Sequence, residues 1–315
     1  MRKLMVVMVV CAVVVGFTTL ASAGELRLIL ATGGTAGTYY PFGGAIAKIW
    51  NSKIPGMNVT AQATGASVEN VRLMNKDEVE LALVQSDTID FAYNAKENFK
   101  EKLTKMSVIA VLYPEVIQFA VRGDLDVKSF NDLKGTRVGV GAPGSGTEAN
   151  FRQLMDIYGL KKDDINAQYL SFAESADQFK DKHIDAFIVV AGVPNSALMD
   201  VANTRSIKIM PVEGTMASML MQKYPFLGAA KIPANTYKGQ TAEVTTVAVM
   251  AVLIAHPKLD NDTVYKMTKA LFENQAELAA GHAKGKELDL RTATKGVSIP
   301  FHPGAVKFYK EKGAM

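Results

Sequence analysis

Residues 26–50 read LRLILATGGTAGTYYPFGGAIAKIW, and this stretch decides the expected fold. Six residues typical of a short β-strand come first, a loop rich in Gly and Thr follows, and apolar side chains then recur at helical spacing. The same order returns at residues 137–158, RVGVGAPGSGTEANFRQLMDIY. Two cycles of strand, Gly/Thr loop and helix predict two similar α/β lobes with mostly parallel sheets.

The remaining segments continue this alternation. Further strands are predicted at 57–64, 81–84, 186–190 and 207–211, and helices at 39–51, 67–75, 148–158 and 262–279. Two long β-rich runs, 107–121 and 244–256, are suited to crossing between lobes, and the charged run 96–105 indicates a solvated helix face. We therefore expect a signal segment at 1–23, lobe I at 24–118, lobe II at 119–247 and a return to lobe I at 248–315.

The amino terminus is typical of a secretory signal peptide. Arg2 and Lys3 precede an apolar run at 4–15, and Ala21-Ser22-Ala23 forms a small-residue cleavage site. An uncleaved anchor is the alternative, although the run is shorter than the roughly 20 residues that span a bilayer. Cleavage after Ala23 predicts an exported, periplasmic protein. The only Cys of the chain, Cys11, lies in this segment, so the mature chain has no thiol chemistry.

Composition and motifs exclude several functions. The 315 residues are 48% hydrophobic and 21% charged, which suits a globular protein, and the scattered basic residues argue against nucleic acid. The four histidines lack metal-ligand spacing. The G-x-G-x-x-G string at 139–144 lacks the acidic residue that a dinucleotide site needs, no P-loop lysine follows it, and Ser145 lacks the glycines of a nucleophile elbow. We expect neither cofactor nor metal.

The two Gly/Thr loops are the strongest candidates for a ligand site. Each precedes a helix, and a helix N-terminus offers free N–H groups and about half a positive charge, which suits a carboxylate. Tight turns with Ser or Thr caps are the alternative for either loop taken alone. Polar residues also follow the strand at 81–84, where they either line a cleft or cap the next helix, and a Tyr-Pro-Glu string at 113–115 lies within a crossing run.

These residues carry a resemblance to a known family. The chain resembles the TAXI-type solute-binding proteins, the extracytoplasmic receptors of TRAP transporters. The matching strings, in family order, are residues 32–47, 64–70 (TGASVEN), 82–87 (ALVQSD), 112–116 (LYPEV), 141–148 (GAPGSGTE), 191–194 (AGVP) and 299–305 (IPFHPGA). The chain departs from the family pattern at Ala66, where Gly is usual, and at Phe301, where Leu is common.

The resemblance implies a periplasmic-binding-protein-like α/β fold, with two lobes joined by two hinge strands and the ligand in the cleft. It also implies a non-catalytic, monomeric receptor that captures glutamate, glutamine, a C4–C5 dicarboxylate or a 2-oxo acid and delivers it to TRAP permease subunits in the membrane. A periplasmic sensor and an enzyme on the same fold remain the alternatives.

We assign candidate ligand-binding residues on this basis. Backbone and hydroxyl donors are Thr35, Gly37, Thr38 and Tyr39 from the first lobe and Ser145, Gly146 and Thr147 from the second. Orienting residues are Ser67, Asn70, Gln85, Ser86 and Tyr113, with Gly192 and Pro194 in the loop after the strand at 186–190. Asp87 or Glu115 would accept the ammonium group of an amino-acid ligand.

Overall fold

The computed structural model describes residues 25–315, so the predicted signal peptide lies outside the described residues. The strands are β1 Leu26–Ala31, β2 Met57–Gln62, β3 Leu81–Gln85, β4 Ser107–Arg122, β5 Arg137–Gly139, β6 Asn166–Gln168, β7 Ala186–Ala191, β8 Ile207–Met210, β9 Gly228–Ile232 and β10 Val244–Ala255. The helices are α1 Tyr39–Lys53, α2 Ser67–Asn75, α3 Ser86–Asn94, α4 Gly146–Ile157, α5 Phe172–Lys180, α6 Ser196–Thr204, α7 Gly214–Lys223, α8 Asn261–Glu273, α9 Gln275–Gly281 and α10 Pro303–Glu311. Short 3₁₀ turns are η1 Phe130–Leu133, η2 Lys162–Asp164 and η3 Ala283–Glu287.

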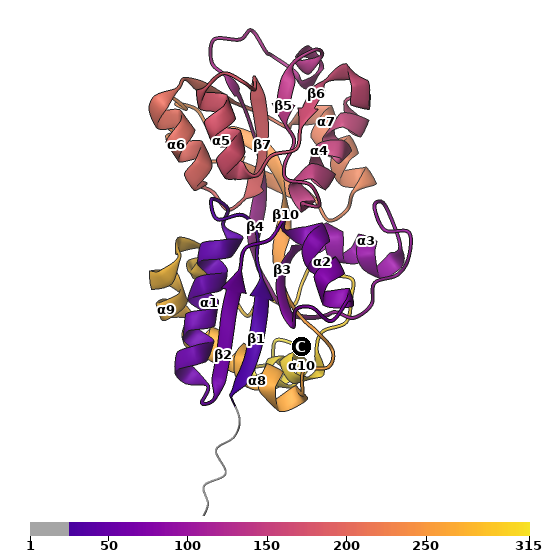
Figure 1. Cartoon of the computed structure of the whole chain (residues 1–315), viewed down its shortest axis with the longest axis vertical. Coiled ribbons are helices and arrows are strands. Elements are labelled where there is room, and N and C mark those ends of the chain that lie inside the picture. Colours follow the sequence, from indigo (N-terminus) through magenta and orange to yellow (C-terminus); the bar gives the residue numbers. More distant parts are fainter. Residues whose placement is uncertain (1–24) are drawn as a thin grey trace, which may run out of the picture.

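Two long antiparallel strands connect two α/β lobes (Figure 1). The strand order is β2-β1-β3-β10-β4-β7-β5-β6, with β8 on β4 and β9 on β10. Pairs within each lobe are parallel, as in β1 with β3 and β5 with β7, whereas β4 and β10 run antiparallel to each other and to their neighbours. This arrangement confirms the predicted fold of two α/β lobes joined by two strands.

Each crossing strand serves both lobes. The first half of β4 lies beside β10 in the lobe that holds β1–β3, and its second half pairs with β7 and β8 in the other lobe. Helices α1–α3 and α8–α10 cover the first lobe and α4–α7 the second (Figure 1). Because strands of one lobe end where strands of the other end, the loops after β1, β3, β5 and β7 face one another across the cleft.

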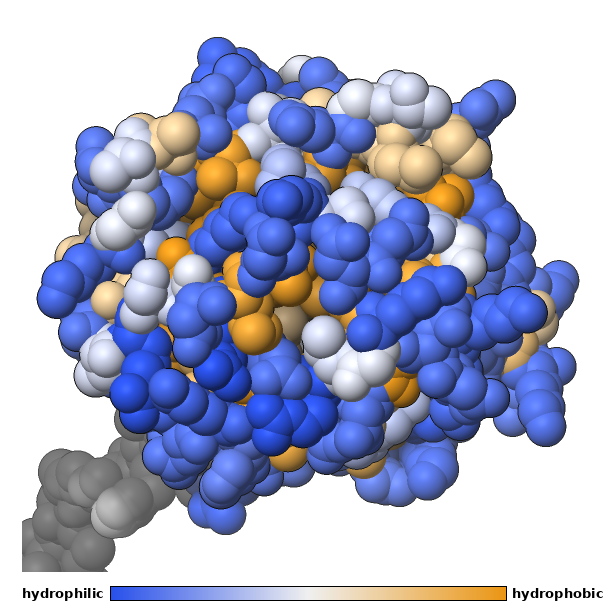
Figure 2. Space-filling view, turned by 90° about the horizontal axis from the view of Figure 1, so that it is seen from above, coloured by the Kyte–Doolittle hydropathy of each residue, from blue (hydrophilic) through white to orange (hydrophobic). Residues whose placement is uncertain are grey.

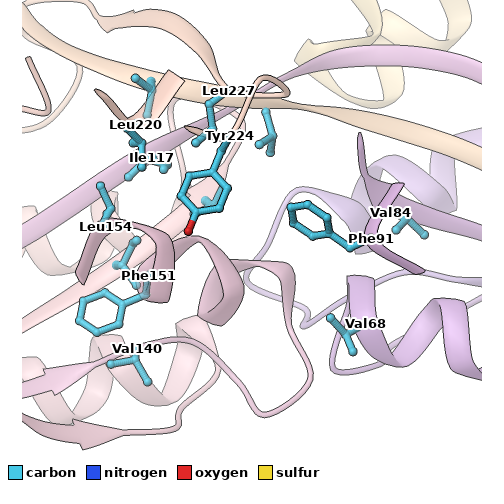
Figure 3. Packing of buried hydrophobic residues seen from close by; sticks show 14 of the residues in the cluster. Val68, Val84, Phe91, Ile117, Val140, Phe151, Leu154, Leu220, Tyr224 and Leu227 are labelled. Atoms are coloured by element: carbon cyan, nitrogen blue, oxygen red, sulfur yellow. The ribbon is translucent and has the colours of Figure 1, made fainter. Parts of the chain in front are cut away.

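Apolar burial holds each lobe together and continues between them. In the first lobe, Trp50 of α1 is fully buried, and its Nε1 donates a hydrogen bond to the carbonyl of Met267 at 2.9 Å. One hydrophobic cluster includes Phe91 of the first lobe together with Phe151 and Tyr224 of the second (Figure 3). The hinge region therefore contains packed side chains as well as backbone pairing.

Two predicted helices differ from the structure. The expected helix at 262–279 is two helices, α8 and α9, separated at Asn274. The helix predicted at 96–105 is wrong, because Ala95 and Glu97 have positive φ angles of 55° and 53° that end α3. Phe99 and Leu103 of this connection are buried, so it packs on the core.

The outer end of the second lobe is largely hydrophilic. Figure 2, viewed from above, shows charged and polar residues over most of this face, with small hydrophobic areas between them. Among all the helices within residues 25–315, none is both long and apolar enough to cross a membrane.

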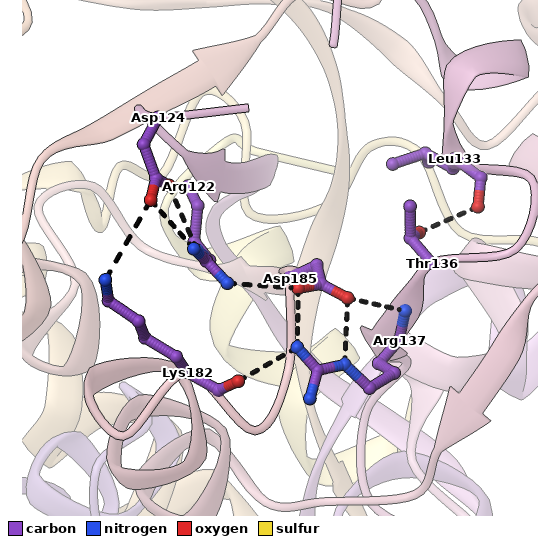
Figure 4. Close-up of polar contacts among 7 residues, drawn as sticks. All are labelled: Arg122, Asp124, Leu133, Thr136, Arg137, Lys182 and Asp185. Carbon is purple, nitrogen blue, oxygen red and sulfur yellow. Dashed lines mark hydrogen bonds and ion pairs between the residues drawn. The ribbon is translucent and has the colours of Figure 1, made fainter. Parts of the chain in front are cut away.

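A partly buried carboxylate, that of Asp185, links three segments at the edge of the second lobe. Asp185 accepts bidentate hydrogen bonds from Arg137 at 2.7 and 2.9 Å, and Arg122 lies 3.3 Å away (Figure 4). The Arg137 guanidinium holds the pKa of Asp185 below its usual range. The ion pairs join the start of β5, the end of β4 and the residue before β7.

We expect Asp185→Ala to lower the free energy of unfolding by about 1.5–3 kcal/mol at pH 7, because charge-assisted bonds to both arginines are lost. Since the pKa of Asp185 is lowered by folding, this stability is present above its unfolded-state value and declines as pH falls through the folded-state value. Urea unfolding at pH 7 and at pH 3 checks both points. Asp124→Ala, which removes a carboxylate with a 56% exposed side chain, is the control and should cost less than about 1 kcal/mol.

Candidate functional site

A cavity of about 70 Å³ lies between the two lobes, and four helices begin at its wall. These are α1 and α2 from the first lobe and α4 and α5 from the second. The lining residues are Gly33, Gly34, Gly37, Thr38, Tyr39, Thr64, Gly65, Ala66, Ser67, Gln85, Glu115, Ala142, Ser145, Gly146, Thr147, Ser171, Phe172, Val190 and Ala191. None of these is Lys, Arg or His. Positive potential in this cavity therefore comes from helix termini and hydrogen-bond donors.

Helix α4 presents the most open set of donors. Ser145 is its N-cap, and the Ser145 Oγ accepts a hydrogen bond from the Glu148 N–H at 3.1 Å. That bond uses an oxygen lone pair and leaves the hydroxyl proton available. Gly146 and Thr147 occupy the first two helical positions, whose N–H groups have no partner within the helix. This terminus can bind an anionic oxygen.

Helix α1 reaches the cavity from the opposite lobe. Thr38 precedes it, and the Thr38 Oγ1 accepts a hydrogen bond from the Gly192 N–H of the second lobe at 3.1 Å. Tyr39, the first residue of the helix, donates its hydroxyl to Glu115 Oε2 at 2.6 Å. The start of α1 thus contacts both the second lobe, through Thr38, and a carboxyl group on β4, through Tyr39.

The start of α2 is bonded directly to the second lobe. The N–H groups of Val68 and Glu69 both donate to the carbonyl of Gly144 at 3.1 Å, so a backbone oxygen of one lobe caps a helix of the other. Ala66, just before the helix, has a φ of 74°. This is a conformation that glycine adopts more easily. The Ala at the position where the resembled family has Gly therefore strains the backbone.

Two polar side chains project into the cavity without a full set of partners. Gln85 is 2% exposed, and within the described residues its Oε1 has no hydrogen-bond partner. Glu115 is also 2% exposed. Burial raises the pKa of Glu115 to about 8, Asp87 adds to this rise, and the hydrogen bond from Tyr39 opposes it. The cavity therefore combines N–H and hydroxyl donors with one carboxyl group.

Asp87 lies behind the cavity wall, in contact with α4. Its Oδ2 accepts hydrogen bonds from Asn150 Nδ2 at 2.8 Å and Gln153 Nε2 at 3.3 Å, and its Oδ1 accepts one from the Thr88 N–H at 2.7 Å. Burial raises the pKa of Asp87 despite these bonds. The carboxylate links α3 of the first lobe to α4 of the second.

Several other predicted residues are occupied by structural bonds. Asn70 Nδ2 donates to the carbonyls of Thr32 and Leu83 and so ties β1 to β3. The Ser86 Oγ accepts from the Met250 N–H of β10 at 3.2 Å. These side chains connect β1, β3 and β10, the strands that lie next to the cavity.

The structure brings together most, but not all, of the residues proposed from the sequence. Those that line the cavity are Gly37, Thr38, Tyr39, Ser67, Gln85, Glu115, Ser145, Gly146 and Thr147. Those outside its lining are Thr35, Asn70, Ser86, Asp87, Tyr113, Gly192 and Pro194. Thr35 and Pro194 are exposed, and the Tyr113 hydroxyl is buried without a partner among the described residues.

The sequence reading missed the wall formed by α5. Ser171 and Phe172 line the cavity, and Ser171 caps α5 in a capping box with Glu174. The string Ser171-x-x-Glu174 is a recognisable signal for a helix start. The start of α5 could therefore have been predicted from the sequence, in addition to the starts of α1 and α4. Residues 25–315 hold no cluster of His, Cys, Asp and Glu suited to a metal ion.

Solved structures with this architecture define the class of fold. A protein from Bordetella bronchiseptica RB50 is 16% identical over 92% of this chain and 89% of its own, with a TM-score of 0.56. The alkanesulfonate-binding protein SsuA from Xanthomonas axonopodis pv. citri, solved with MOPS, is 14% identical over 91% and 84%, with a TM-score of 0.51. GshT of Streptococcus mutans, described in glutathione import, is 15% identical over 84% and 98%, with a TM-score of 0.52. At these identities the likeness establishes a periplasmic-binding-protein fold.

A match to a protein family gives more specific information than the likeness of folds. Residues 30–313 match the NMT1-like family, which covers most of the chain and nearly all of its described part. The chain belongs to the NMT1-like family.

Proposed function

We propose that this protein is an exported solute-binding receptor that captures a small carboxylate in the cavity between its lobes and delivers it to a membrane permease. The observation that carries the proposal is the N-terminus of α4, whose first N–H groups have no partner within the helix, in a cavity at which α1, α2 and α5 also begin and which has no cationic side chain among its lining residues. Helix N-termini bind carboxylates through fixed N–H groups. The protein would act without a cofactor and without catalysis, as a monomer in the periplasm.

The finer assignment is a receptor of the TAXI type that serves a TRAP permease, with glutamate, glutamine, a C4–C5 dicarboxylate or a 2-oxo acid as ligand. The sequence strings that resemble that family support it, and every one of them except 299–305 contributes residues to the lining of the cavity. We place the lobe boundaries at 118/119 and 247/248. Close to these boundaries, β4 passes from β10 to β7 at Val116, and β10 passes from β9 to β4 at Ala248.

A thermal-shift screen of residues 24–315, refolded to remove bound ligand, tests the proposal. The panel contains L-glutamate, L-glutamine, succinate, 2-oxoglutarate and ethanesulfonate. A ligand at about 100 times its dissociation constant should add roughly 2.7 kcal/mol of stability, or several degrees. An increase in melting temperature with carboxylates supports the proposal. An increase with ethanesulfonate alone would mean that the ligand is a sulfonate and that the proposed carboxylate class is wrong.

Removing one hydroxyl donor at the start of α4 should weaken ligand binding. We expect Ser145→Ala and Thr147→Ala each to reduce binding by about 1–3 kcal/mol, because each hydroxyl would lose a hydrogen bond to a charged oxygen in a buried site. Isothermal titration with the acid found in the screen measures the change. Ser218→Ala, on the exposed face of α7 and away from the cavity, is the control. Unchanged affinity in both cavity variants would contradict a role for α4.

A further inference from the structure

Glu115 is a buried carboxyl group that forms part of the wall of the ligand cavity. It lies on β4, 2% exposed, and the Tyr39 hydroxyl is its one hydrogen-bond donor among the described residues. That bond goes to Oε2, which leaves Oε1 without a donor. An ionised carboxylate in a water-poor cavity normally accepts several hydrogen bonds or pairs with a cation.

Within residues 25–315, the charged groups around Glu115 do not supply that cation. From α3, Asp87 adds a second negative charge, and from β10 the residue opposite Glu115 is the apolar Val249. From η3, the Lys284 ammonium lies 2.6 Å from Glu287 and is paired there. On β4 itself the nearest titratable group is Tyr113, whose pKa burial raises well above its usual value, so that it stays neutral.

We propose that Glu115 enters the closed cavity as the neutral carboxylic acid, keeps its proton, and donates a hydrogen bond to an oxygen of the captured anion. The proton comes from solvent and forms the O–H bond on Glu115 Oε1, so that binding of one ligand takes up about one proton. The inference rests on the proposed function and deepens it. A neutral acid at this position selects a ligand with an oxygen acceptor there and disfavours an ammonium group.

The sign of the pH dependence follows from the closing of the lobes. We expect Glu115 to be solvated in the open protein, with a pKa near the ordinary value of 4.5, whereas burial in the closed cavity raises its pKa to about 8. The closed state binds more protons at neutral pH, so low pH favours it. Affinity should fall by about tenfold per unit between roughly pH 5 and pH 7.5, and level off above about pH 8.

Calorimetry measures the proton directly. Succinate, 2-oxoglutarate and L-glutamate are titrated into the mature protein at pH 7.0 in phosphate and in Tris, two buffers with different ionisation enthalpies. The difference between the binding enthalpies measured in the two buffers, divided by the difference between the buffers' ionisation enthalpies, should correspond to about one proton taken up per ligand bound. Glu115→Gln, whose amide can still donate a hydrogen bond, should bind the same acid without proton uptake. Glu101→Gln, an exposed position outside the cavity, should leave the proton uptake at its wild-type value.

The outcomes separate this inference from the proposed function. Binding of any probe without proton uptake overturns the inference, because Glu115 then remains ionised beside the ligand. If none of the three acids binds, the proposed ligand class fails, and ¹³C NMR titration of the Glu115 carboxyl carbon decides about the proton. That titration is made in the complex with whichever of L-glutamine and ethanesulfonate binds, because ligand-free, open protein is itself expected to titrate near 4.5. In the complex, a midpoint near pH 8, absent in Glu115→Gln, supports the neutral acid, whereas a midpoint near 4.5 overturns it.

Discussion

Gly146→Val is expected to weaken ligand binding by roughly a hundredfold or more while both lobes remain folded. A Cβ atom at Gly146 would lie 1.7 Å from Gln85 Oε1, 2.5 Å from Gln85 Cδ and 3.0 Å from Ser67 Oγ. The Gln85 side chain is buried and lines the cavity, so its amide can make room only by moving into the space that the ligand needs. The variant would keep α4 and α2 apart, so the closed arrangement that surrounds the ligand would not form.

The measurement is a titration of the wild type and Gly146→Val with the same acid, together with small-angle scattering to follow closure. Gly44→Ala is the matched control, since a Cβ at Gly44 on α1 meets nothing within 4 Å. We expect Gly44→Ala to bind like the wild type. Wild-type affinity in Gly146→Val would show that the lobes do not close on the ligand as described.

Asp87→Ala is the second substitution with a large expected effect. The buried carboxylate accepts hydrogen bonds from Asn150 and Gln153 across the lobes. Its removal leaves the Gln153 Nε2 without a partner and the Asn150 Nδ2 with Gln153 Oε1 as its one remaining acceptor among the described residues. Binding should weaken by about 1–3 kcal/mol, or about tenfold to a hundredfold in Kd, because the closed state loses this stabilisation and the open state does not.

A double-mutant cycle with Asn150→Ala tests whether the pair acts across the cleft. The two substitutions together should cost clearly less than the sum of the single ones. Asp90→Ala, on the same helix, is the control, because Asp90 accepts from Ser298 at 2.6 Å within the first lobe. Asp90→Ala should lower the free energy of unfolding and leave the affinity for the ligand nearly unchanged. Additive effects of Asp87→Ala and Asn150→Ala would contradict the cross-lobe contact.

The sequence was sufficient to predict the repeating architecture. Strand β1, its Gly/Thr loop and α1 are marked by β-rich, small and helically spaced apolar residues in turn, and the same order recurs from β5 to α4. The long apolar runs that became β4 and β10 indicated the two crossings. Local periodicity is enough for these features, because each belongs to a single segment.

The orientation of single residues within the site was beyond the sequence. Gln85 faces the cavity and Asp87 faces α4, although the two are separated by one residue, because α3 begins at Ser86 directly after β3. Where a strand turns into a helix, the side-chain period changes from two to 3.6 residues per turn, and a shift of one position redirects every side chain. A choice between Asp87 and Glu115 as the cavity carboxyl therefore needed the tertiary structure.

The most direct test of the account is a side-by-side titration of the wild type and Gly146→Val with L-glutamate, L-glutamine, succinate and 2-oxoglutarate. The account predicts that at least one acid binds the wild type with one-to-one stoichiometry and that the same acid does not bind the variant. An acid that binds both proteins equally would place the site outside the cleft. Failure of all four to bind the wild type would contradict the carboxylate receptor itself.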